Sequence, residues 1–583
     1  MLLSHTTKVP PACSRRTTEG TVAAAHDVSV QAGLAMLAQG GNAVDAAVAA
    51  ALVAGVIEPT ETTLAGCGFM LIGDATSVHS VEFGPRAPLA ARETMFKVLE
   101  DAAASNILGL APVEGNANVD GPRASGVPRT ITGLLEAQAR FGKLDRRTVM
   151  EPAIRAAADG FEVDSWFLVN TLSDLTRLAA DPGAAAVFLE DGLPVGRLRQ
   201  GYYGHSVDFA DKVRQPTLAR TLDQLADQGP TSVTSGEIGR SLLATFEEYG
   251  LLLTAADLAN AGPDIRPPLT RAYRGVDVHV PNAPGGGMTE LEILGIWEWI
   301  YPDGAPIADS PERIRNLALA IKHAFADRYH WLGDPDHVPV PVDELLSASY
   351  SRRLARQCLS EPIPESFGDG SAPWGFFAEY ALHNPYADPS QAPVWTPGTA
   401  TEPTTGTTHV TAADADGMFV TITHTAANHY GSGIVCPRTG FLLDSQMAWF
   451  NALPGAANSI RPGARPLANM GPVLLTDARG AFAAIGASGG RRIVSAVAQI
   501  VINLVDRAMS PLEALQAPRI DGSGPNTVLP QELAHLTPAL EGLAPMVIPP
   551  TSSYYALDFA RANLVGAVEG GLESAVDAQC YSY

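Results

Sequence analysis

Cysteine is sparse in this sequence, and its placement excludes two common kinds of site. The chain of 583 residues has five cysteines, which lie far apart and include no C-x-x-C pair. An odd, scattered set of this kind predicts neither a disulfide framework nor a zinc site. We therefore expect that the function depends neither on disulfide bonds nor on a cysteine-bound metal.

Positive charge and long apolar runs are lacking as well. Lys and Arg number 39 against 62 Asp and Glu, so the net charge is −23, and no basic block could neutralise nucleic-acid phosphates. The longest apolar stretch, residues 43–57, contains Asp45 and is shorter than the roughly 20 residues that a membrane span requires. Residues 1–20 lack the apolar core of a secretion signal. We expect a cytoplasmic protein that binds neither nucleic acid nor membrane.

The remaining composition is that of a folded, loop-rich protein. Hydrophobic residues make up 46% and charged residues 17%, with 55 Gly and 45 Pro. A chain of this length buries a large core, in two folding units or in one large multilayer domain. Periodicity and capping signals predict strands at residues 20–26, 69–72, 80–83, 276–280, 440–446 and 482–485, and helices at 27–38, 43–57, 132–141, 146–159, 165–180, 221–226, 288–299, 321–331 and 491–505.

The most informative stretch has two runs rich in β-branched residues on either side of Asp416-Gly417, a pattern that predicts a β-hairpin. A three-residue turn that ends with this glycine in the left-handed conformation sets Thr411 opposite Thr421. The same register sets Thr407 opposite Thr425, within the short distance of cross-strand pairs. Two hydroxyl groups then face each other at the open end of the hairpin. A slip by one residue would abolish this pairing.

The pairing supports a catalytic interpretation. The chain would cut itself between Gly406 and Thr407, and Thr407 would become both the nucleophile and, through its new α-amino group, its own general base. An α-amino group has an ordinary pKa of about 8, so a useful fraction is unprotonated near neutral pH. Residues 361–405 are dense in Pro, Gly, Ser and Thr, which is typical of an exposed segment that could present the bond. The competing interpretation is an ordinary threonine-rich strand.

Two loops carry further signals. A predicted strand runs into Gly486-Ala487-Ser488-Gly489-Gly490 before a helix begins, and amide donors at such a turn could stabilise an oxyanion. Arg86 lies in a rigid loop between Pro85 and Pro88, where it could hold a substrate carboxylate or be only structural. The pair Gly40-Gly41 lacks the other residues of a phosphate cradle, so we expect no cofactor there or elsewhere.

Seven motifs follow one another in a recognisable order. They are Gly41-Asn42-Ala43-Val44-Asp45-Ala46-Ala47, Tyr273-Arg274-Gly275, Ala326-Asp327-Arg328, Gly333-Asp334-Pro335, Thr407-Thr408-His409, Arg465-Pro466-Leu467 and Ser488-Gly489-Gly490. Together they resemble the γ-glutamyltransferase family, over residues 20–520 of this chain. Members of that family are N-terminal-nucleophile hydrolases with a four-layer αββα fold, an α+β architecture, and are made as precursors that cleave themselves.

The resemblance implies a division of the chain and a set of roles. A large subunit, residues 1–406, and a small subunit, residues 407–583, would stay paired in one intertwined αββα unit. Thr407 would attack an amide of the substrate, and Thr425 would orient it. Gly489 and Gly490 would provide the oxyanion hole. The acyl-enzyme would then pass its acyl group to water or to a second amine.

The sequence departs from the family where the family binds the glutamyl head group. In typical members an arginine, an asparagine, an aspartate and two serines hold the α-carboxylate and the α-amino group; the matching positions here are Gly84, Ala427, Trp449 and Ala468-Asn469. Without those partners a charged head group should bind poorly. We therefore predict a pocket for an acyl group other than a standard γ-glutamyl group, with the candidate binding residues Arg86, Asn428, Gln446, Trp449 and Asn469.

The leading hypothesis is an autoprocessing amidase or acylase that acts on a small-molecule amide, for example one whose distal carboxylate binds Arg86. A true γ-glutamyltransferase or glutathione hydrolase is one alternative. An uncleaved homologue that binds a ligand without catalysis is another, from a different class. A metal enzyme built on His409, His424 and His429 is disfavoured, because the hairpin register puts the first two on opposite faces of the sheet.

Overall fold

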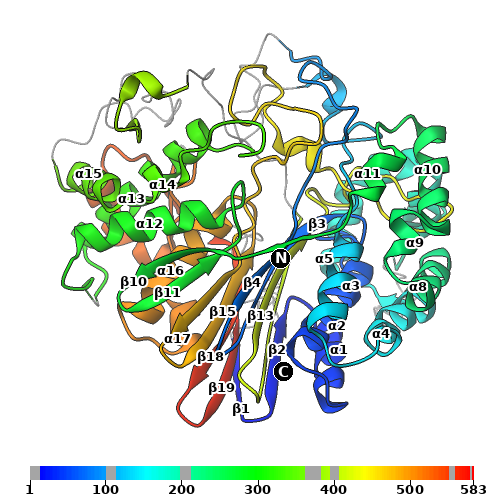
Figure 1. Ribbon diagram of the computed structural model, residues 1–583, viewed down its shortest axis with the longest axis horizontal. Coiled ribbons are helices and arrows are strands. Elements are labelled where there is room, and N and C mark those ends of the chain that lie inside the picture. The colour runs from blue at the N-terminus through cyan, green and yellow to red at the C-terminus, as the bar shows by residue number, and fades with distance from the viewer. Residues whose placement is uncertain are drawn as a thin grey trace, which may run out of the picture.

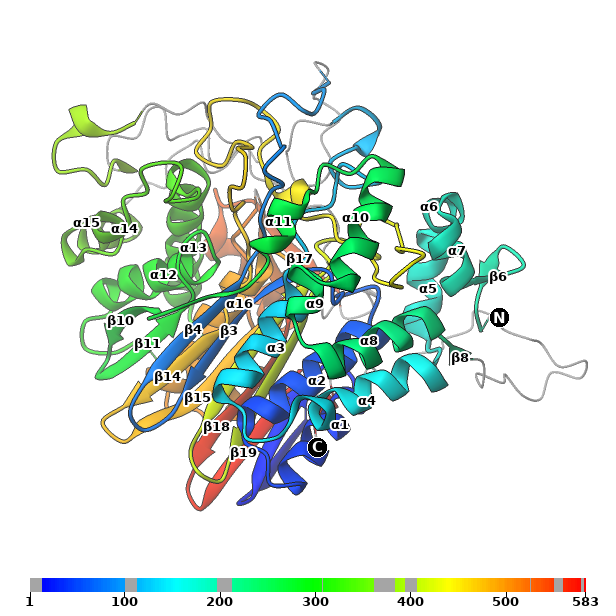
Figure 2. The same ribbon diagram turned by 45° about the vertical axis from the view of Figure 1, so that its right-hand side comes forward.

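Two β-sheets packed face to face form the centre of the protein. The computed structural model describes residues 13–99, 113–196, 212–306, 308–360, 383–393, 406–524, 526–549, 559–577 and 581–582. Within these ranges each of the two central sheets has seven strands, and helices cover both outer faces (Figures 1 and 2). This is the four-layer αββα arrangement that the family resemblance implies. Among the helices of these ranges, none has the length and apolar character needed to cross a bilayer.

Both large sheets are antiparallel throughout. The first contains, in spatial order, β1 (Cys13–Thr17), β19 (Gly571–Val576), β18 (Arg561–Val568), β15 (Gly480–Ser488), β14 (Val473–Asp477), β11 (Val276–Val280) and β10 (Leu269–Tyr273). The second contains β20 (Tyr581–Ser582), β2 (Gly20–Ala24), β12 (Thr408–Asp414), β13 (Phe419–Thr425), β3 (Cys67–Gly73), β4 (Val78–Phe83) and β9 (Asp264–Arg266).

Each sheet has its own helical cover, and the two covers lie on opposite sides of the molecule in Figure 1. The second sheet packs on helices from the N-terminal half: α1 (Asp27–Ala38), α2 (Ala43–Ile57), α3 (Thr130–Phe141), α4 (Arg146–Asp159), α8 (Pro216–Gln228) and α10 (Glu237–Tyr249). The first sheet packs on α12 (Gly287–Ile300), α13 (Pro311–Trp331), α15 (Ala348–Leu359), α16 (Arg492–Val505) and α17 (Pro511–Gln516). Shorter helices complete the layers: α5 (Ser165–Ser173), α6 (Leu175–Ala180), α7 (Pro182–Phe188), α9 (Thr231–Thr234), α11 (Ala255–Ala259) and α14 (Val342–Leu345).

The central helix and strands are buried on all sides, which explains their composition. α2 consists almost entirely of Ala, Val and Leu, because it lies between a sheet and other helices. The Asn42 side chain accepts from the backbone of Asp45, and the Asp45 side chain accepts from Asn42, so the predicted cap is a full capping box. Every residue of β12 and β13 is buried between α2 and the other sheet. The centre of the fold therefore holds the hairpin that the sequence singled out.

Three predicted elements differ from the structure. The predicted helix 165–180 is two helices, because the chain breaks at Asp174 between α5 and α6. The predicted helix 321–331 is the last half of α13, which begins at Pro311 after a Ser310 cap. The predicted strand 440–446 is wrong: this part forms two isolated bridges, between Val435 and Leu442 and between Ala65 and Leu443, since the glycines around it adopt left-handed conformations that interrupt an extended ladder. The predicted exposed segment 361–405 lies outside the described residues except for 383–393.

Candidate active site

The β12–β13 hairpin has the register that the sequence predicts. Thr411 pairs with Thr421, and Thr408 pairs with His424, which sets Thr407 opposite Thr425. The turn closes with a bond of 3.1 Å from the backbone N of Asp414 to the carbonyl of Met418, and Gly417 has a φ of 88°. Gly417 is thus in the left-handed conformation that a three-residue turn requires.

The two threonine hydroxyls lie against the bond that precedes Thr407. The Thr407 Oγ1 donates to Thr425 Oγ1 at 3.4 Å, and the Thr425 hydroxyl donates to the carbonyl oxygen of Gly406. Thr425 Oγ1 also accepts from the backbone N–H of Ala427 at 2.8 Å. These bonds orient one hydroxyl and polarise the carbonyl next to it, as an attack of Thr407 on that carbonyl requires. Gly406 itself is sterically required, because a Cβ there would overlap the carbonyl oxygen of Thr60.

The nitrogen of the same bond contacts a glutamate. The backbone N–H of Thr407 donates to Glu61 Oε2 at 3.0 Å. Glu61 is also bonded by Trp166 Nε1 at 2.9 Å and ion-paired with Arg561 at 3.1 Å. Sequence reasoning missed all three residues, because segments far apart in the chain deliver them and none belongs to a recognisable motif. The only available signal for Glu61 was an acidic residue close in sequence to a predicted strand.

The glycine turn predicted as an oxyanion hole follows the last residue of β15. Ser488 pairs with Arg561 at the start of β18, and Arg561 reaches Glu61 next to Thr407. Gly489 and Gly490 have φ values of 134° and 64°, and a Cβ on Gly489 would lie 2.9 Å from the Cα of Ala560. Gly489 is therefore required, and the left-handed φ of Gly490 favours glycine there too. The turn sits at the same end of the two sheets as the threonine pair.

The histidines near the hairpin are buried and uncharged. His409 bonds to Thr423 at 2.8 Å between the two sheets, whereas His424 bonds to Thr62 at 2.7 Å on the other face. Burial lowers the pKa of each to about 3. Their opposite orientation matches the prediction. Within the part of the chain that the structure describes, no cluster of His, Cys, Asp or Glu is arranged to hold a metal ion.

Gln446 uses its amide to hold the Arg86 loop. Its Oε1 accepts from the backbone N of Arg86 at 2.5 Å, and its Nε2 donates to Val127 at 3.2 Å and to Asp444. Burial raises the pKa of Asp444 to about 7. The Arg86 guanidinium pairs with Asp264 at 3.2 Å. These contacts make Gln446 a support for the loop, and a substrate carboxylate would have to compete with Asp264 for Arg86.

Three of the positions that depart from the family lie together in an apolar cluster. We define this cluster, called the apolar cluster below, as Cys67, Phe69, Ala427, Trp449, Ala468 and Met470. It adjoins the threonine pair, because Cys67 pairs with Thr425 across β3 and β13 and Ala427 bonds to the Thr425 hydroxyl. Burial raises the pKa of the Cys67 thiol well above its ordinary value, as expected for a packing residue.

The other predicted binding residues have different surroundings. Asn428 is buried next to Ala427, and its carbonyl accepts from Gly431 at 2.8 Å. The Asn469 side chain accepts from Arg328 of α13 at 2.9 Å, and Arg328 also bonds to the carbonyl of Ala468 at 2.7 Å. Arg328 therefore fixes the loop on which the family has two serines.

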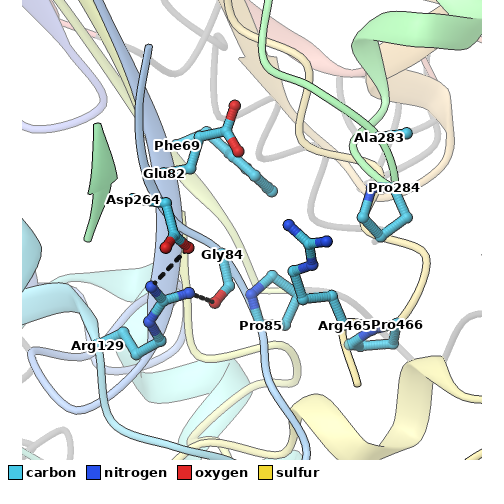
Figure 3. Close-up of a pocket in the computed structure, with 10 residues that line it drawn as sticks. All are labelled: Phe69, Glu82, Gly84, Pro85, Arg129, Asp264, Ala283, Pro284, Arg465 and Pro466. Atoms are coloured by element: carbon cyan, nitrogen blue, oxygen red, sulfur yellow. Dashed lines mark hydrogen bonds and ion pairs between the residues drawn. The ribbon is translucent and has the colours of Figure 1, made fainter. Parts of the chain in front are cut away.

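A small hollow, partly open to solvent, adjoins Phe69 (Figure 3). Arg129 donates to the carbonyl of Gly84 at 3.0 Å and pairs with Asp264 at 3.1 Å, and the Arg465 side chain points toward Phe69 from below. A Cβ on Gly84 would lie 2.7 Å from the Phe69 ring, so this ring takes the place in which the family arginine would begin. The hollow thus lies on the side of Phe69 where charged side chains, Glu82, Arg129, Asp264 and Arg465, gather.

The four layers and the threonine pair at the sheet ends define the fold class as that of N-terminal-nucleophile hydrolases. The structure of cephalosporin acylase from Bacillus halodurans superimposes with a TM-score of 0.79, covering 100% of this chain and 99% of that one at 22% identity, which shows the shared fold. The family model for gamma-glutamyltranspeptidase matches residues 29–534, and the chain belongs to this family.

Curated relatives agree with this assignment. The acylase ACY 1 proenzyme of Pseudomonas sp. (strain SE83) is 34% identical over 505 residues, 86% of this chain and 82% of that protein. The glutathione hydrolase proenzyme of Escherichia coli is 31% identical over 523 residues, 86% and 81%. The chain is therefore an amidohydrolase or acyltransferase of the gamma-glutamyltranspeptidase family.

Proposed function

We propose that the protein is an autoprocessing amide hydrolase with Thr407 as its nucleophile. The observation that carries the proposal is the chain of hydroxyl contacts from Thr407 through Thr425 to the Gly406 carbonyl oxygen. An ordinary threonine-rich strand would not need its last hydroxyl pair to contact the preceding peptide carbonyl. The names of two relatives, which are both called proenzymes, also support the proposal.

Self-cleavage would proceed by an N-to-O acyl shift. Thr407 Oγ1 attacks the carbonyl carbon of Gly406, a C–O bond forms, and the C–N bond to Thr407 breaks. The hydroxyl proton passes to that nitrogen, which becomes a free α-amino group. Water then hydrolyses the ester to give a Gly406 carboxylate and a free Thr407 hydroxyl. The Thr425 hydroxyl stabilises the negative charge on the carbonyl oxygen during the attack.

The two pieces, residues 1–406 and 407–583, would remain associated as large and small subunits. The ladders β2–β12 and β13–β3 join them in one sheet, and β1–β19 and β11–β14 join them in the other. β12, which begins next to the bond, lies between β2 and β13. Cleavage therefore leaves the new N-terminus held inside a sheet.

In the mature protein the Thr407 hydroxyl would attack the amide of a small-molecule substrate. The α-amino group of Thr407 takes the hydroxyl proton and later returns it to the leaving amine. Gly489 and Gly490 donate to the oxyanion. Water or a second amine then releases the acyl group.

Intact-mass analysis tests the nucleophile. The wild-type chain should give two fragments that meet at Thr407, and Thr407→Ala should remain one chain with the same thermal stability. A Thr407→Ala variant that still splits after Gly406 would disprove the assignment. An intact wild-type chain after prolonged incubation would favour the uncleaved, ligand-binding alternative.

The acyl group that fits best is apolar and uncharged rather than γ-glutamyl. Ala427, Trp449 and Ala468 offer no charged partner to an amino-acid head group, and burial of an unpaired ion costs several kcal/mol, on the order of 10³-fold in binding or rate. The Trp449 Nε1–H is buried and meets no acceptor among the described residues. An acyl group with an ether or carbonyl oxygen near an aromatic or alkyl part would satisfy that donor.

A panel of 4-nitroanilides tests this choice. Phenoxyacetyl, phenylacetyl, glutaryl and γ-glutamyl anilides differ in charge and in the acceptor oxygen. We expect kcat/KM for the phenoxyacetyl compound to exceed that for the γ-glutamyl compound by about 100-fold or more. Trp449→Phe should lower the phenoxyacetyl value and leave the phenylacetyl value nearly unchanged. Faster γ-glutamyl release would favour a glutathione hydrolase, and preference for the glutaryl compound would favour binding through Arg86.

A further inference from the structure

The nitrogen of Thr407 has a partner that the proposed reaction does not yet explain. Glu61 Oε2 accepts from this nitrogen at 3.0 Å in the uncut chain. Glu61 is almost completely buried and is fixed on its other side by Trp166 Nε1 at 2.9 Å. Arg561 pairs with Glu61 at 3.1 Å and stacks over the Trp166 ring, 5.3 Å from its centroid. A buried carboxylate that is held by Trp166 and Arg561 and accepts from one nitrogen is a prepared site for that nitrogen.

We propose that Glu61 is a positioning residue that holds the α-amino group of Thr407 in the mature enzyme and sets the pH range in which this group acts as a base. The inference rests on the proposed function, because it requires a free N-terminal Thr407. Arg561 and Trp166 keep the Glu61 carboxylate in place. Glu61 touches the nitrogen in both states, first as an amide and then as an amine.

The chemistry of the two states explains why a carboxylate suits this position. A peptide nitrogen offers one N–H, whereas an α-ammonium group offers three and carries a positive charge. Glu61 Oε2 contacts this nitrogen directly, and Arg561 reaches the same Glu61 oxygen at 3.1 Å. An opposite charge within about 4 Å favours the protonated amine and raises its pKa. The base thus becomes active at a higher pH than an isolated α-amine would.

Other charged groups around Glu61 and Arg561 contribute to the same field. They are Glu58 next to α2, Asp164 before α5, Asp174 and Arg177 of the α5–α6 region, and His429 after β13. Burial lowers the pKa of His429, so this side chain is uncharged near neutral pH. Burial raises the pKa of Glu58 to about 7, so Glu58 is mostly ionised in the alkaline range in which an α-amine titrates, and its charge favours the ammonium form as well. Arg177 pairs with Asp174 at 2.9 Å. Glu61 is the carboxylate in direct contact with the nitrogen.

Glu61→Gln tests the proposal, because it keeps the shape and an acceptor oxygen but removes the charge. The pKa of the Thr407 α-amine can be read without a substrate, from the pH dependence of its carbamoylation by cyanate, with the α-amine of the large piece as internal reference. We expect Glu61→Gln to lower this pKa by about 1 to 3 units, and the acid limb of kcat/KM to move with it. Glu573→Gln is the matched control, since Glu573 is equally buried and pairs with Arg16 at 3.0 Å far from the nitrogen.

Trp166→Phe provides an independent measurement of the α-amine pKa if Glu61→Gln does not fold or does not cleave itself. It keeps the ring under Arg561 and removes only the N–H donor, so the Glu61 charge is less neutralised and the α-amine pKa should rise. An unchanged pKa in the folded, cleaved Glu61→Gln variant overturns the proposal, and so does an unchanged pKa in Trp166→Phe. Cleavage of Thr407→Ala would instead overturn the proposed function itself.

Discussion

Replacing Thr425 by valine removes one hydroxyl and keeps the shape of the side chain. In the structure this hydroxyl donates to the Gly406 carbonyl oxygen and accepts from the Ala427 N–H at 2.8 Å. Loss of one preorganised donor to a developing oxyanion typically slows a reaction about 10² to 10³-fold, or about 2.7 to 4 kcal/mol. The Ala427 N–H would also lose its acceptor in a buried site, which should lower the free energy of unfolding by about 1 to 3 kcal/mol.

The assay is a time course of intact mass on freshly purified chain, with thermal unfolding of the same samples. We expect Thr425→Val to remain uncut over periods in which the wild type splits completely. Thr425→Ser keeps the hydroxyl and should split at a rate closer to the wild type. Thr411→Val is the control for stability alone, because Thr411 is buried on the same hairpin and bonds to Asn563 at 2.8 Å, away from the scissile bond.

Two results of this time course would contradict a role of Thr425 in self-cleavage. If folded Thr425→Val splits within a few-fold of the wild-type rate, the contact with the Gly406 carbonyl does not contribute to self-cleavage. If Thr411→Val slows splitting as much, the effect is one of stability and not of chemistry.

Three further expectations concern Gly406, His409 and Glu58. Gly406→Ala should slow self-cleavage, because the new Cβ would overlap the Thr60 carbonyl oxygen and displace the carbonyl that Thr407 attacks. A time course of intact mass measures the rate of cleavage. An unchanged rate would show that the backbone adjusts to the extra carbon. Burial lowers the His409 pKa to about 3, whereas the unfolded chain has an ordinary value near 6.5. Between these two pH values the unfolded state binds more protons, so the free energy of unfolding falls as the pH falls. His409→Gln should reduce the slope of this pH dependence by about 1.4 kcal/mol per pH unit. Glu58 should change the free energy of unfolding with pH in the opposite direction. Burial raises its pKa to about 7, so the folded state binds the extra proton and gains stability as the pH falls below 7. Glu58→Gln removes this gain and should make the protein more acid-sensitive. Denaturant unfolding between pH 5 and 7 measures both slopes, and equal slopes in the two variants would contradict this account.

The hairpin was predictable because its signals are local. Two runs rich in β-branched residues and one Asp-Gly turn predict the register of β12 and β13, and α2 follows from its cap and its apolar sequence. The family motifs supplied the four layers, which local patterns alone could not. Helix ends were less accurate, as for α13, where Ser310 and Pro311 form an earlier start.

The surroundings of the scissile bond were not predictable in the same way. Glu61, Trp166 and Arg561 meet only in three dimensions, and single-sequence patterns do not report contacts between positions that far apart. Gln446 was a candidate binding residue, and its side chain accepts from the backbone N of Arg86, a contact that the sequence could not indicate. The exchange of polar for apolar residues at Ala427, Trp449 and Ala468 was visible in sequence, and the structure adds that these residues touch one another.

The position of β12 between β2 and β13 affects whether the protein can refold after it has been unfolded. Before the proposed cut, the chain would fold as one molecule, and its refolding would not depend on concentration. After the proposed cut, the strands β2 and β13 on either side of β12 would belong to different chains, so reassembly of separated sheets would become bimolecular. Unfolding of the mature form would then be effectively irreversible in dilute solution, and its working lifetime would depend on the rate at which the sheets open.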